Sequence, residues 1–116
     1  TLPKIFCVNW FRKGADGKFV WPGYGDNMRV LAWMLERVAG RGAAQEHVFG
    51  LSPRHEDRDW TGLPFSREQY ASVVTTSLEA WQAELALHAA LFGNLVPRLP
   101  EALRATRARF ERRLAA

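Results

Sequence analysis

One stretch near the start of the chain, residues 8–30, constrains the fold more than any other part of the sequence. It holds five of the 14 aromatic residues in about a fifth of the chain's length. Two extended runs, residues 5–11 and 18–21, flank the polar turn Gly14-Ala15-Asp16-Gly17. Asp-Gly between apolar runs is a strong local signal for two antiparallel strands joined by a tight turn. The stretch therefore predicts a β-hairpin.

A glycine-rich turn and a helix follow this hairpin. The turn, Pro22-Gly23-Tyr24-Gly25, contains glycines that allow backbone angles other residues resist. Asp26 or Asn27 then offers a side-chain oxygen that can cap a helix by accepting a hydrogen bond from a free backbone N–H group. Apolar residues recur at helical spacing up to Gly40, which ends the helix. They predict a buried stripe made of Val30, Leu31, Met34, Leu35 and Val38.

This arrangement sets aromatic rings beside the start of a helix. Rings supply flat faces for stacking, and a helix start supplies unpaired N–H donors. A planar ligand with polar edges, such as a purine, uses both kinds of group. Spacing alone also fits a hairpin whose rings simply pack a hydrophobic core.

The stretch after the first helix has no helical pattern, and residues 47–51 predict one short strand. The loop that follows carries four side chains of the types that bind metals. They crowd together without helical or strand spacing, which is typical of a solvated loop rather than a metal site. These four residues are His55, Glu56, Asp57 and Asp59. We therefore expect no metal ligands in this chain.

Three further helices are predicted in the second half. Ser66 and Gln69 match a capping box, which opens a helix to about Val74. A restart near Ser77 predicts a helix to Phe92, and residues 100–115 form the last helix. Together the elements predict an α+β fold, with an N-terminal β-hairpin or short sheet followed by three to four packed helices.

The net charge of +4 comes from the last segment, where residues 98–116 carry six arginines against Glu101 and Glu111. A basic helix can contact nucleic acid. This one is amphipathic, with an apolar side made of Leu99, Leu103, Phe110 and Leu114. We therefore interpret the arginines as a solvated helix face rather than a nucleic-acid interface.

The remaining composition is that of an ordinary globular chain of one domain at most. The single cysteine, Cys7, excludes an internal disulfide and suits a reducing, cytoplasmic location. No apolar run approaches the length of a membrane span, and no signal peptide is visible. Because the chain starts at Thr1 and runs straight into an apolar segment, we interpret it as a piece of a longer protein.

Two motifs are more specific than these patterns. They are Asn9-Trp10-Phe11-Arg12-Lys13 and the run from Gly17 to Asn27, GKFVWPGYGDN. The sequence from about Leu2 to Val38 closely resembles the C-terminal nucleotide-binding segment of the GTP-dependent phosphoenolpyruvate carboxykinases. The resemblance implies a fragment of a larger mixed α/β nucleotide-binding domain. Residues 1–116 would form a single C-terminal piece, with the hairpin and guanine pocket in 1–27 and a mainly helical cap in 28–116.

In that family two aromatic rings sandwich the guanine base, a third lies against its edge, and an Asn after the Gly-rich turn helps to read it. The resemblance places these roles on Phe11 and Tyr24, on Phe19, and on Asn27. Tyr24 stands where many family members carry Phe. Backbone groups of the turn complete a predicted nucleotide-binding set of Phe11, Phe19, Tyr24, Gly25, Asp26 and Asn27.

For the parent enzyme the resemblance implies conversion of oxaloacetate and GTP to phosphoenolpyruvate, carbon dioxide and GDP, a step of gluconeogenesis, with Mn²⁺ and Mg²⁺. The Gly-rich phosphate loop with its Lys is not in this sequence, so we expect it, the metal ligands and the oxaloacetate-binding residues upstream of Thr1. The chain is then predicted to hold no catalytic residue and to be inactive alone. Its expected partners are GTP or GDP and the upstream part of the same enzyme. Two alternatives are a structural or interaction domain and a nucleic-acid-binding module built on the basic helix.

Overall fold

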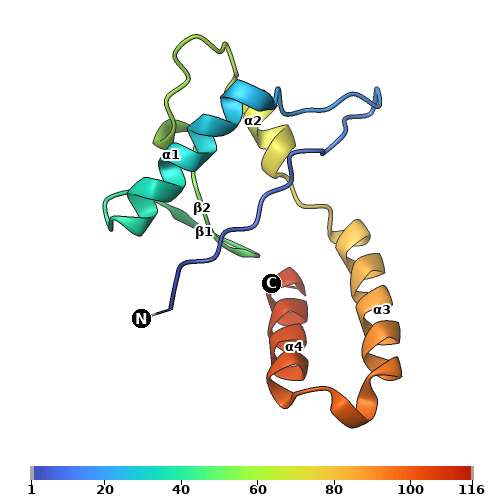
Figure 1. Cartoon of the computed structure of the whole chain (residues 1–116). Helices are drawn as coiled ribbons and strands as arrows, with labels where there is room; N and C mark the ends of the chain where they lie inside the picture. Colours follow the sequence, from blue (N-terminus) through green and yellow to red (C-terminus); the bar gives the residue numbers. More distant parts are fainter. Residues whose placement is uncertain (1, 116) are drawn as a thin grey trace. The chain divides into compact units, whose positions relative to one another are not determined.

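The computed structural model describes residues 2–115, which fall into two compact units. Unit 1 comprises the chain up to His47 together with Leu51–Thr75, and unit 2 comprises Val48–Gly50 together with the chain from Thr76 onward. Unit 1 contains the helices α1 (Asn27–Val38) and α2 (Arg67–Val74), whereas α3 (Leu78–Asn94) and α4 (Glu101–Ala115) belong to unit 2 (Figure 1).

The predicted N-terminal hairpin forms its turn. The Gly14 N–H group donates to the Lys18 carbonyl oxygen at 2.9 Å, and Lys13 and Phe19 form an antiparallel bridge. Gly17 has φ 76°, a left-handed conformation that glycine adopts without steric cost. The turn chemistry read from Asp16-Gly17 is therefore confirmed.

The two runs beside this turn do not form a regular ladder. The Val20 N–H group donates to the Arg12 carbonyl oxygen at 2.9 Å, and this bond and the Gly14–Lys18 bond are the two that make the bridge. Pro22 then removes a backbone donor, and Gly23 at φ 76° turns the chain away. The expected N-terminal hairpin is thus reduced to a bridge with supporting bonds.

The two-stranded sheet lies later in the chain. Strands β1 (Gln45–His47) and β2 (Gly50–Ser52) pair as neighbours across a two-residue turn, which makes them antiparallel. The prediction of one strand over residues 47–51 is wrong, because the chain turns at residues 48–49 and Gly50 begins a second strand. The predicted fold class, α+β with a short sheet and packed helices, is confirmed.

Helix α1 begins and ends where the sequence predicted, but its buried side is different. Val30 and Trp33 are buried, with 6% and 7% of their surface exposed, whereas Leu31, Leu35 and Val38 are exposed. Spacing defines an apolar stripe but not the neighbours that cover it. The prediction of one buried stripe over all five apolar positions is therefore wrong.

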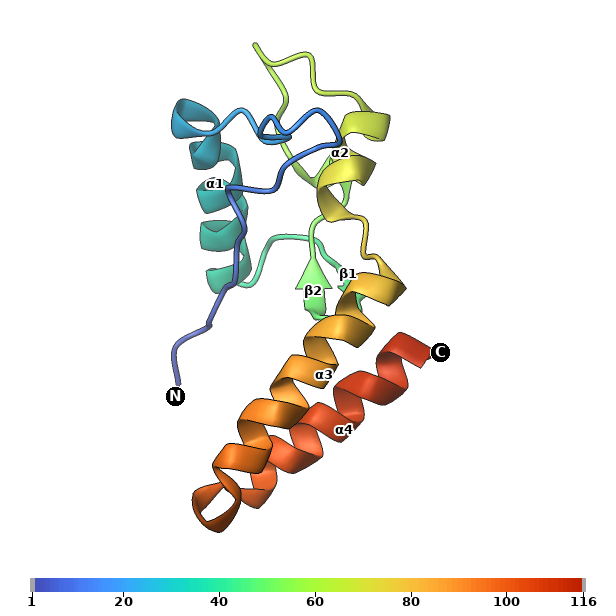
Figure 2. The same ribbon diagram turned by 90° about the vertical axis from the view of Figure 1, so that its right-hand side faces the viewer.

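The N-terminal segment covers part of α1. Phe6 packs edge-on against the Trp33 ring, with centroids 6.0 Å apart, and Lys4 donates a hydrogen bond to the Arg37 carbonyl oxygen. Figures 1 and 2 show this segment running beside the helix. The Trp33 indole N–H also donates to the Ala43 carbonyl oxygen at 2.8 Å. These contacts explain why Trp33, off the predicted stripe, is buried.

The core of unit 1 is a cluster of buried side chains from distant parts of the sequence: Trp21, Val30, Phe65 and Tyr70. Helix α2 supplies Tyr70 and begins with the predicted capping box. The Gln69 N–H group donates to Ser66 Oγ at 3.2 Å, and the Ser66 N–H group donates to Gln69 Oε1 at 2.8 Å. This prediction is confirmed.

Unit 2 consists mainly of α3 and α4, which lie side by side in opposite directions (Figure 2). Its ring cluster joins three aromatic side chains. The Phe49 ring centroid lies 4.5 Å from that of Trp81 and 5.1 Å from that of Phe110. On α4, Arg107 forms an ion pair of 2.8 Å with Glu111, while Arg109 is exposed. Within residues 2–115 no helix combines the length and the hydropathy of a membrane span.

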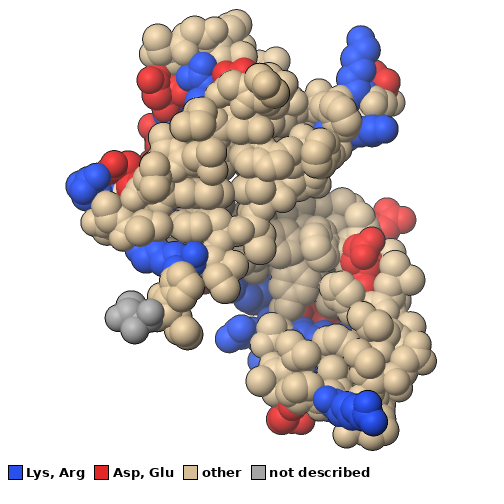
Figure 3. Space-filling model, in the orientation of Figure 1, with Lys and Arg blue, Asp and Glu red and all other residues tan. Residues whose placement is uncertain are grey.

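Large apolar side chains remain exposed on unit 1. In Figure 3 its charged side chains lie toward the edges of the visible face, with a broad uncharged area between them. The exposed apolar residues of α1 and the N-terminal segment are Leu2, Ile5, Val8, Met28, Leu31, Leu35 and Val38. Exposed apolar surface of this extent is typical of a face that another protein segment covers.

Candidate functional site

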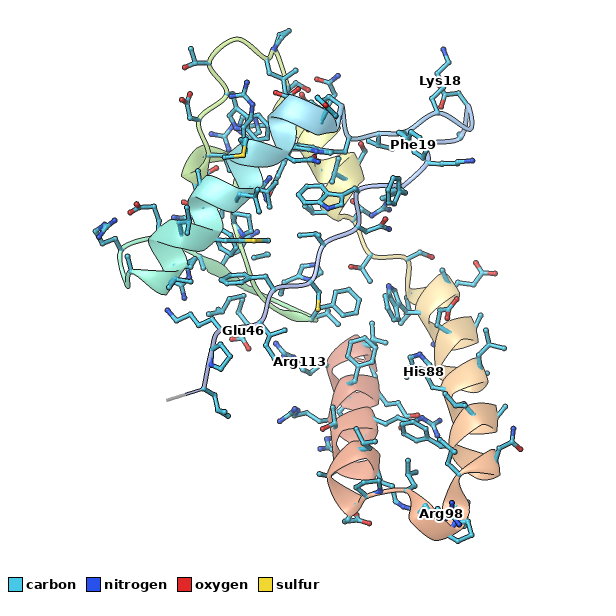
Figure 4. All side chains as sticks on the ribbon, viewed as in Figure 1. Lys18, Phe19, Glu46, His88, Arg98 and Arg113 are labelled. Atoms are coloured by element: carbon cyan, nitrogen blue, oxygen red, sulfur yellow. The ribbon has the colours of Figure 1, made fainter. Side chains whose placement is uncertain are left out.

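The three rings of the predicted nucleotide site are exposed to solvent. Phe11, Phe19 and Tyr24 expose 71%, 57% and 98% of their surface. Phe11 and Phe19 face each other across the hairpin, edge to face, with centroids 5.8 Å apart. Figure 4 shows Phe19 beside Lys18 on the hairpin loop. Because these rings lie outside the core, their placement does not fit the alternative in which every aromatic side chain packs the interior.

The glycine-rich turn holds Tyr24 away from the core. Gly23 has φ 76° and Tyr24 itself has φ 48°, a left-handed conformation that is uncommon for a residue with a side chain. Tyr24–Asp26 forms a short 3-10 turn in which the Asp26 N–H group donates to the Gly23 carbonyl oxygen at 3.1 Å. The Asn27 N–H group is likewise engaged within this turn, with the Tyr24 carbonyl oxygen.

Asn27, the residue that the resemblance assigns to base reading, is the first residue of α1 and is half-buried. Its Oδ1 atom accepts a hydrogen bond of 2.8 Å from the Trp21 indole N–H. Neither Asp26 nor Asn27 caps α1 with its side chain, so that prediction is wrong. The physical reason is the backbone, because both residues have helical φ and ψ angles and a capping residue lies outside the helical region.

Asp26 uses its carboxylate to hold Arg29, at 2.9 Å from Nε. The two Arg29 Nη atoms donate to the carbonyl oxygens of Asp59 and Thr61, at 2.7 and 2.9 Å. A side chain of the predicted site thus anchors the loop before α2 to the start of α1. Sequence reasoning missed this link because Arg29 and Asp59 are 30 residues apart.

Arg12 anchors the other arm of the site. Its Nη1 atom donates to the carbonyl oxygens of Val73 and Thr75, at 2.8 and 2.6 Å. The last carbonyl groups of a helix have no partner within the helix, so a cation at the end of α2 satisfies groups that need a donor. Arg12 therefore ties the hairpin that carries Phe11 to the end of α2.

Behind the turn, Trp21 is held from several sides. The Arg58 guanidinium lies 5.9 Å from the Trp21 ring and 5.4 Å from the Tyr70 ring, where cation–π attraction operates. Burial lowers the pKa of Arg58 and raises the pKa of Tyr70, whose hydroxyl donates to the Pro53 carbonyl oxygen at 2.6 Å. Trp21, which donates to Asn27, is therefore held among packed side chains that include Arg58 and Tyr70.

A hollow on unit 1 has a volume of about 210 Å³, and its lining includes none of the predicted nucleotide-binding residues. Three of its charged side chains already have partners: Arg29 pairs with Asp26, Glu36 with Arg41 at 2.8 Å, and Asp57 with Arg54 at 3.0 Å. We assign no ligand to this hollow.

The loop with four metal-ligand residue types uses them for other contacts. His55 Nε2 lies 2.8 Å from the Phe65 carbonyl oxygen, and its ring stacks on Trp60. Glu56 pairs with Arg67 at 2.9 Å, while Asp59 accepts from the Thr61 N–H group at 2.8 Å. Nowhere in residues 2–115 do three His, Cys, Asp or Glu side chains gather as a metal ion would require. The residues described here do not fit a divalent metal site.

Comparison with known proteins identifies a family for this chain. The family model described as the phosphoenolpyruvate carboxykinase C-terminal P-loop domain matches residues 1–113.

Several curated relatives named phosphoenolpyruvate carboxykinase (GTP) match most of the chain. A relative from Anaeromyxobacter sp. (strain K) is 50% identical over 101 residues, which cover 87% of this chain and 17% of the relative. Relatives from Arthrobacter sp. (strain FB24) and Corynebacterium efficiens are 46% identical over 104 residues and 44% identical over 99 residues. These cover 90% and 85% of this chain, and 17% and 16% of the relatives.

The chain thus spans about 17% of the length of such relatives. The family match itself covers nearly every residue, including both arms of the hairpin, the glycine-rich turn, the helices α1, α2 and α3, and most of α4. The chain therefore belongs to the family of the phosphoenolpyruvate carboxykinase C-terminal P-loop domain.

Proposed function

We propose that this chain is the base-recognition part of a GTP-dependent phosphoenolpyruvate carboxykinase. The parent enzyme would convert oxaloacetate and GTP to phosphoenolpyruvate, GDP and carbon dioxide, a step of gluconeogenesis. The observation that carries the proposal is the family match over residues 1–113 together with three solvent-exposed rings at the positions of the guanine pocket.

In this proposal Phe11 and Tyr24 stack on the two faces of guanine, and Phe19 lies against its edge. The edge-to-face contact between Phe11 and Phe19 supports these roles. In this contact the ring assigned to the edge of the base packs against one of the two rings assigned to its faces. Asn27 and the turn at Gly25 and Asp26 meet the polar atoms of the base. Guanine carries an acceptor at O6 and donors at N1 and the 2-amino group, so a matched set of protein groups distinguishes it from adenine.

The chain supplies recognition rather than chemistry. The phosphate loop, the Mn²⁺ and Mg²⁺ ligands and the oxaloacetate-binding residues are assigned to the rest of the parent enzyme. In this proposal the catalytic steps fall on those parts of the parent enzyme and on no residue of this chain. We propose that residues 1–116 form a single C-terminal piece of the nucleotide-binding domain, with the guanine pocket in 1–27 and a mainly helical cap in 28–116.

Two further assignments belong to the proposal. The exposed apolar surface of α1 and the N-terminal segment supports the upstream part of the same enzyme as a partner, since such a surface is usually covered. A cytoplasmic location agrees with a chain whose one cysteine is a free, exposed thiol.

The test is steady-state kinetics of the enzyme that contains this chain, with Asn27→Ala. We expect the KM for GTP to rise about tenfold, as loss of a hydrogen bond to a buried polar group implies, and the KM for oxaloacetate to stay within about twofold. An unchanged KM for GTP would contradict the assignment of Asn27 to base recognition. Equal use of GTP and ATP by the unmodified enzyme would contradict the proposal of a guanine site as a whole.

A further inference from the structure

We propose that Trp21 is a positioning residue that sets the purine choice of this site. Its indole N–H fixes the orientation of the Asn27 side-chain amide, and that orientation suits guanine and disfavours adenine. The inference rests on the proposed function, and it assigns a specificity role to a core residue that no ligand is expected to touch.

The chemistry of the indole makes the orientation unambiguous. The Trp21 Nε1 atom lies 2.8 Å from Asn27 Oδ1, and an indole N–H can only donate. The atom of the amide that meets it must therefore be the oxygen. If the amide turned over, its NH₂ group would face the indole N–H, and two donors would oppose each other without a hydrogen bond.

The indole cannot turn away from this contact. Trp21 exposes only 4% of its surface. Its ring centroid lies 5.6 Å from that of Phe65, 6.3 Å from that of Trp60 and 6.4 Å from that of Trp10. Because these rings surround it, a different rotamer would require repacking of the core of unit 1. The donor that holds Asn27 is thus fixed before any nucleotide binds.

A fixed amide discriminates between purines. Guanine presents an acceptor at O6 beside a donor at N1, whereas adenine presents a donor at N6 beside an acceptor at N1. A side-chain amide pairs with either edge, but only in opposite orientations, because turning it over exchanges its oxygen and its NH₂ group. With Oδ1 held toward Trp21, the group of Asn27 directed away from the indole is NH₂. That group donates to O6 of guanine and opposes the amino group of adenine.

Asn27 does not cap α1, because its backbone is already helical, at φ −59° and ψ −29°, whereas a capping residue lies outside the helical region. Its side-chain oxygen is therefore not engaged by a backbone N–H group of the first helical turn. The indole takes this oxygen, and the amide keeps one defined orientation at the edge of the predicted base site.

The test measures kcat/KM for GTP, ITP and ATP in the enzyme that contains this chain, with Trp21→Phe. Removing the donor frees the amide, so we expect the GTP-to-ATP ratio of kcat/KM to fall about tenfold, mostly through a lower KM for ATP. The ITP-to-ATP ratio should fall by the same factor, because hypoxanthine shares O6 and N1–H with guanine but lacks the 2-amino group.

Trp60→Phe is the matched control. Trp60 belongs to the same ring cluster, and its indole N–H donates one hydrogen bond of 2.8 Å, to the His55 carbonyl oxygen. Like Trp21→Phe, the substitution shortens an indole to a phenyl ring and removes one hydrogen bond of an indole N–H group. It leaves the Trp21–Asn27 contact in place. We expect a comparable loss of thermal stability and an unchanged GTP-to-ATP ratio.

Two further variants keep the test decisive if Trp21→Phe fails to fold. Replacing Trp21 with benzothienylalanine keeps the ring shape but substitutes sulfur for the N–H group, and it should lower the ratio as Trp21→Phe does. Asn27→Asp keeps an acceptor for the indole and puts an oxygen where NH₂ stood. This substitution should weaken the binding of GTP more than the binding of ATP.

A folded Trp21 variant that keeps the wild-type ratio would overturn the positioning role. If Asn27→Ala still raises the KM for GTP in that case, the proposed function stands and only this inference fails. A ratio that falls equally in Trp60→Phe would assign the effect to general loosening of the core, and would also overturn it.

Discussion

The guanidinium of Arg12 donates a hydrogen bond of 2.6 Å to the carbonyl oxygen of Thr75, 63 residues later in the chain. The same nitrogen reaches the Val73 carbonyl oxygen. The arm of the hairpin that carries Phe11 is therefore held by the end of α2, and not by a ladder of strand hydrogen bonds. The position of a predicted stacking ring depends on a helix far away in the sequence.

Arg12→Ala should destabilise unit 1. It leaves two carbonyl oxygens at the end of α2 without their charged donor, which costs about 1–3 kcal/mol in the free energy of unfolding. Arg12→Lys should recover part of this loss, because an ammonium group still donates but cannot match the planar guanidinium. Thermal unfolding followed by circular dichroism measures both. Arg109→Ala, at an exposed position of α4, is the control, and an equal melting temperature for Arg12→Ala and this control would contradict the clamp.

Gly23→Ala should also destabilise the chain. Gly23 has φ 76°, where an alanine costs about 1–2 kcal/mol even though nothing crowds its Cβ position. Gly25→Ala is the matched control, because its Cβ would likewise meet open space and its backbone is not left-handed. Denaturant titration should place the midpoint of Gly23→Ala well below that of Gly25→Ala. Coincident midpoints would show that the turn adapts without strain.

The stability of unit 1 should fall in acid. Hydrogen bonds from Arg54 hold the pKa of Asp57 below its usual range, and the Asp57 side chain is only 6% exposed. A carboxyl group with a lowered folded-state pKa stabilises the fold above its unfolded pKa, about 3.9, and this contribution is lost as the pH falls through the folded-state pKa. Asp57→Asn should lower the stability of the fold at neutral pH, and the stability that remains should depend less on pH in acid.

Melting temperatures of the wild type and Asp57→Asn, measured from about pH 7 down to about pH 2, test this dependence. The two curves should converge in acid, where Asp57 is protonated in the wild type. Parallel curves over the whole range would remove Asp57 from the explanation.

The isolated 116-residue chain should bind GTP only at millimolar concentration or weaker. Base stacking supplies roughly 1–3 kcal/mol and each hydrogen bond about 1 kcal/mol, while association itself costs at least about 4 kcal/mol. The phosphate-binding groups of the proposed parent are not part of this sequence. The exposed apolar side of α1 should also make the chain self-associate. Calorimetric titration with GTP beside light scattering measures both, and micromolar binding by a monodisperse monomer would show a self-sufficient binding domain.

Local signals in the sequence predicted the parts of the fold that depend on neighbouring residues. Ser66 caps α2 as expected, because a cap needs only a side chain and an N–H group three residues later. The restart of the helix near Ser77 was predicted as well, and in the structure Ser77 itself caps α3. Features that depend on distant partners were not predictable in the same way. The burial of Trp33 depends on Phe6, and no periodicity within α1 reports that contact.

The candidate site likewise has some features that the sequence predicted and others that it did not. The resemblance to a known family identified the exposed rings, since the motif lies in one continuous segment. It did not reveal that the indole of Trp21 would take the oxygen of Asn27, because this contact depends on how the turn between the two residues folds. An available signal was a tryptophan six residues before the asparagine, with a glycine-rich turn between them to bring the two together.

The position of Phe49 has a consequence for the order in which a ribosome lets this chain fold. Every residue of unit 1 has been synthesised once Thr75 is added, so its core can close early. The rings of Phe49 and Phe110 must meet to complete unit 2, and Phe110 is made 61 residues after Phe49. The Phe49 ring can therefore pack on Trp81 first, and its cluster is completed only when Phe110 has been added.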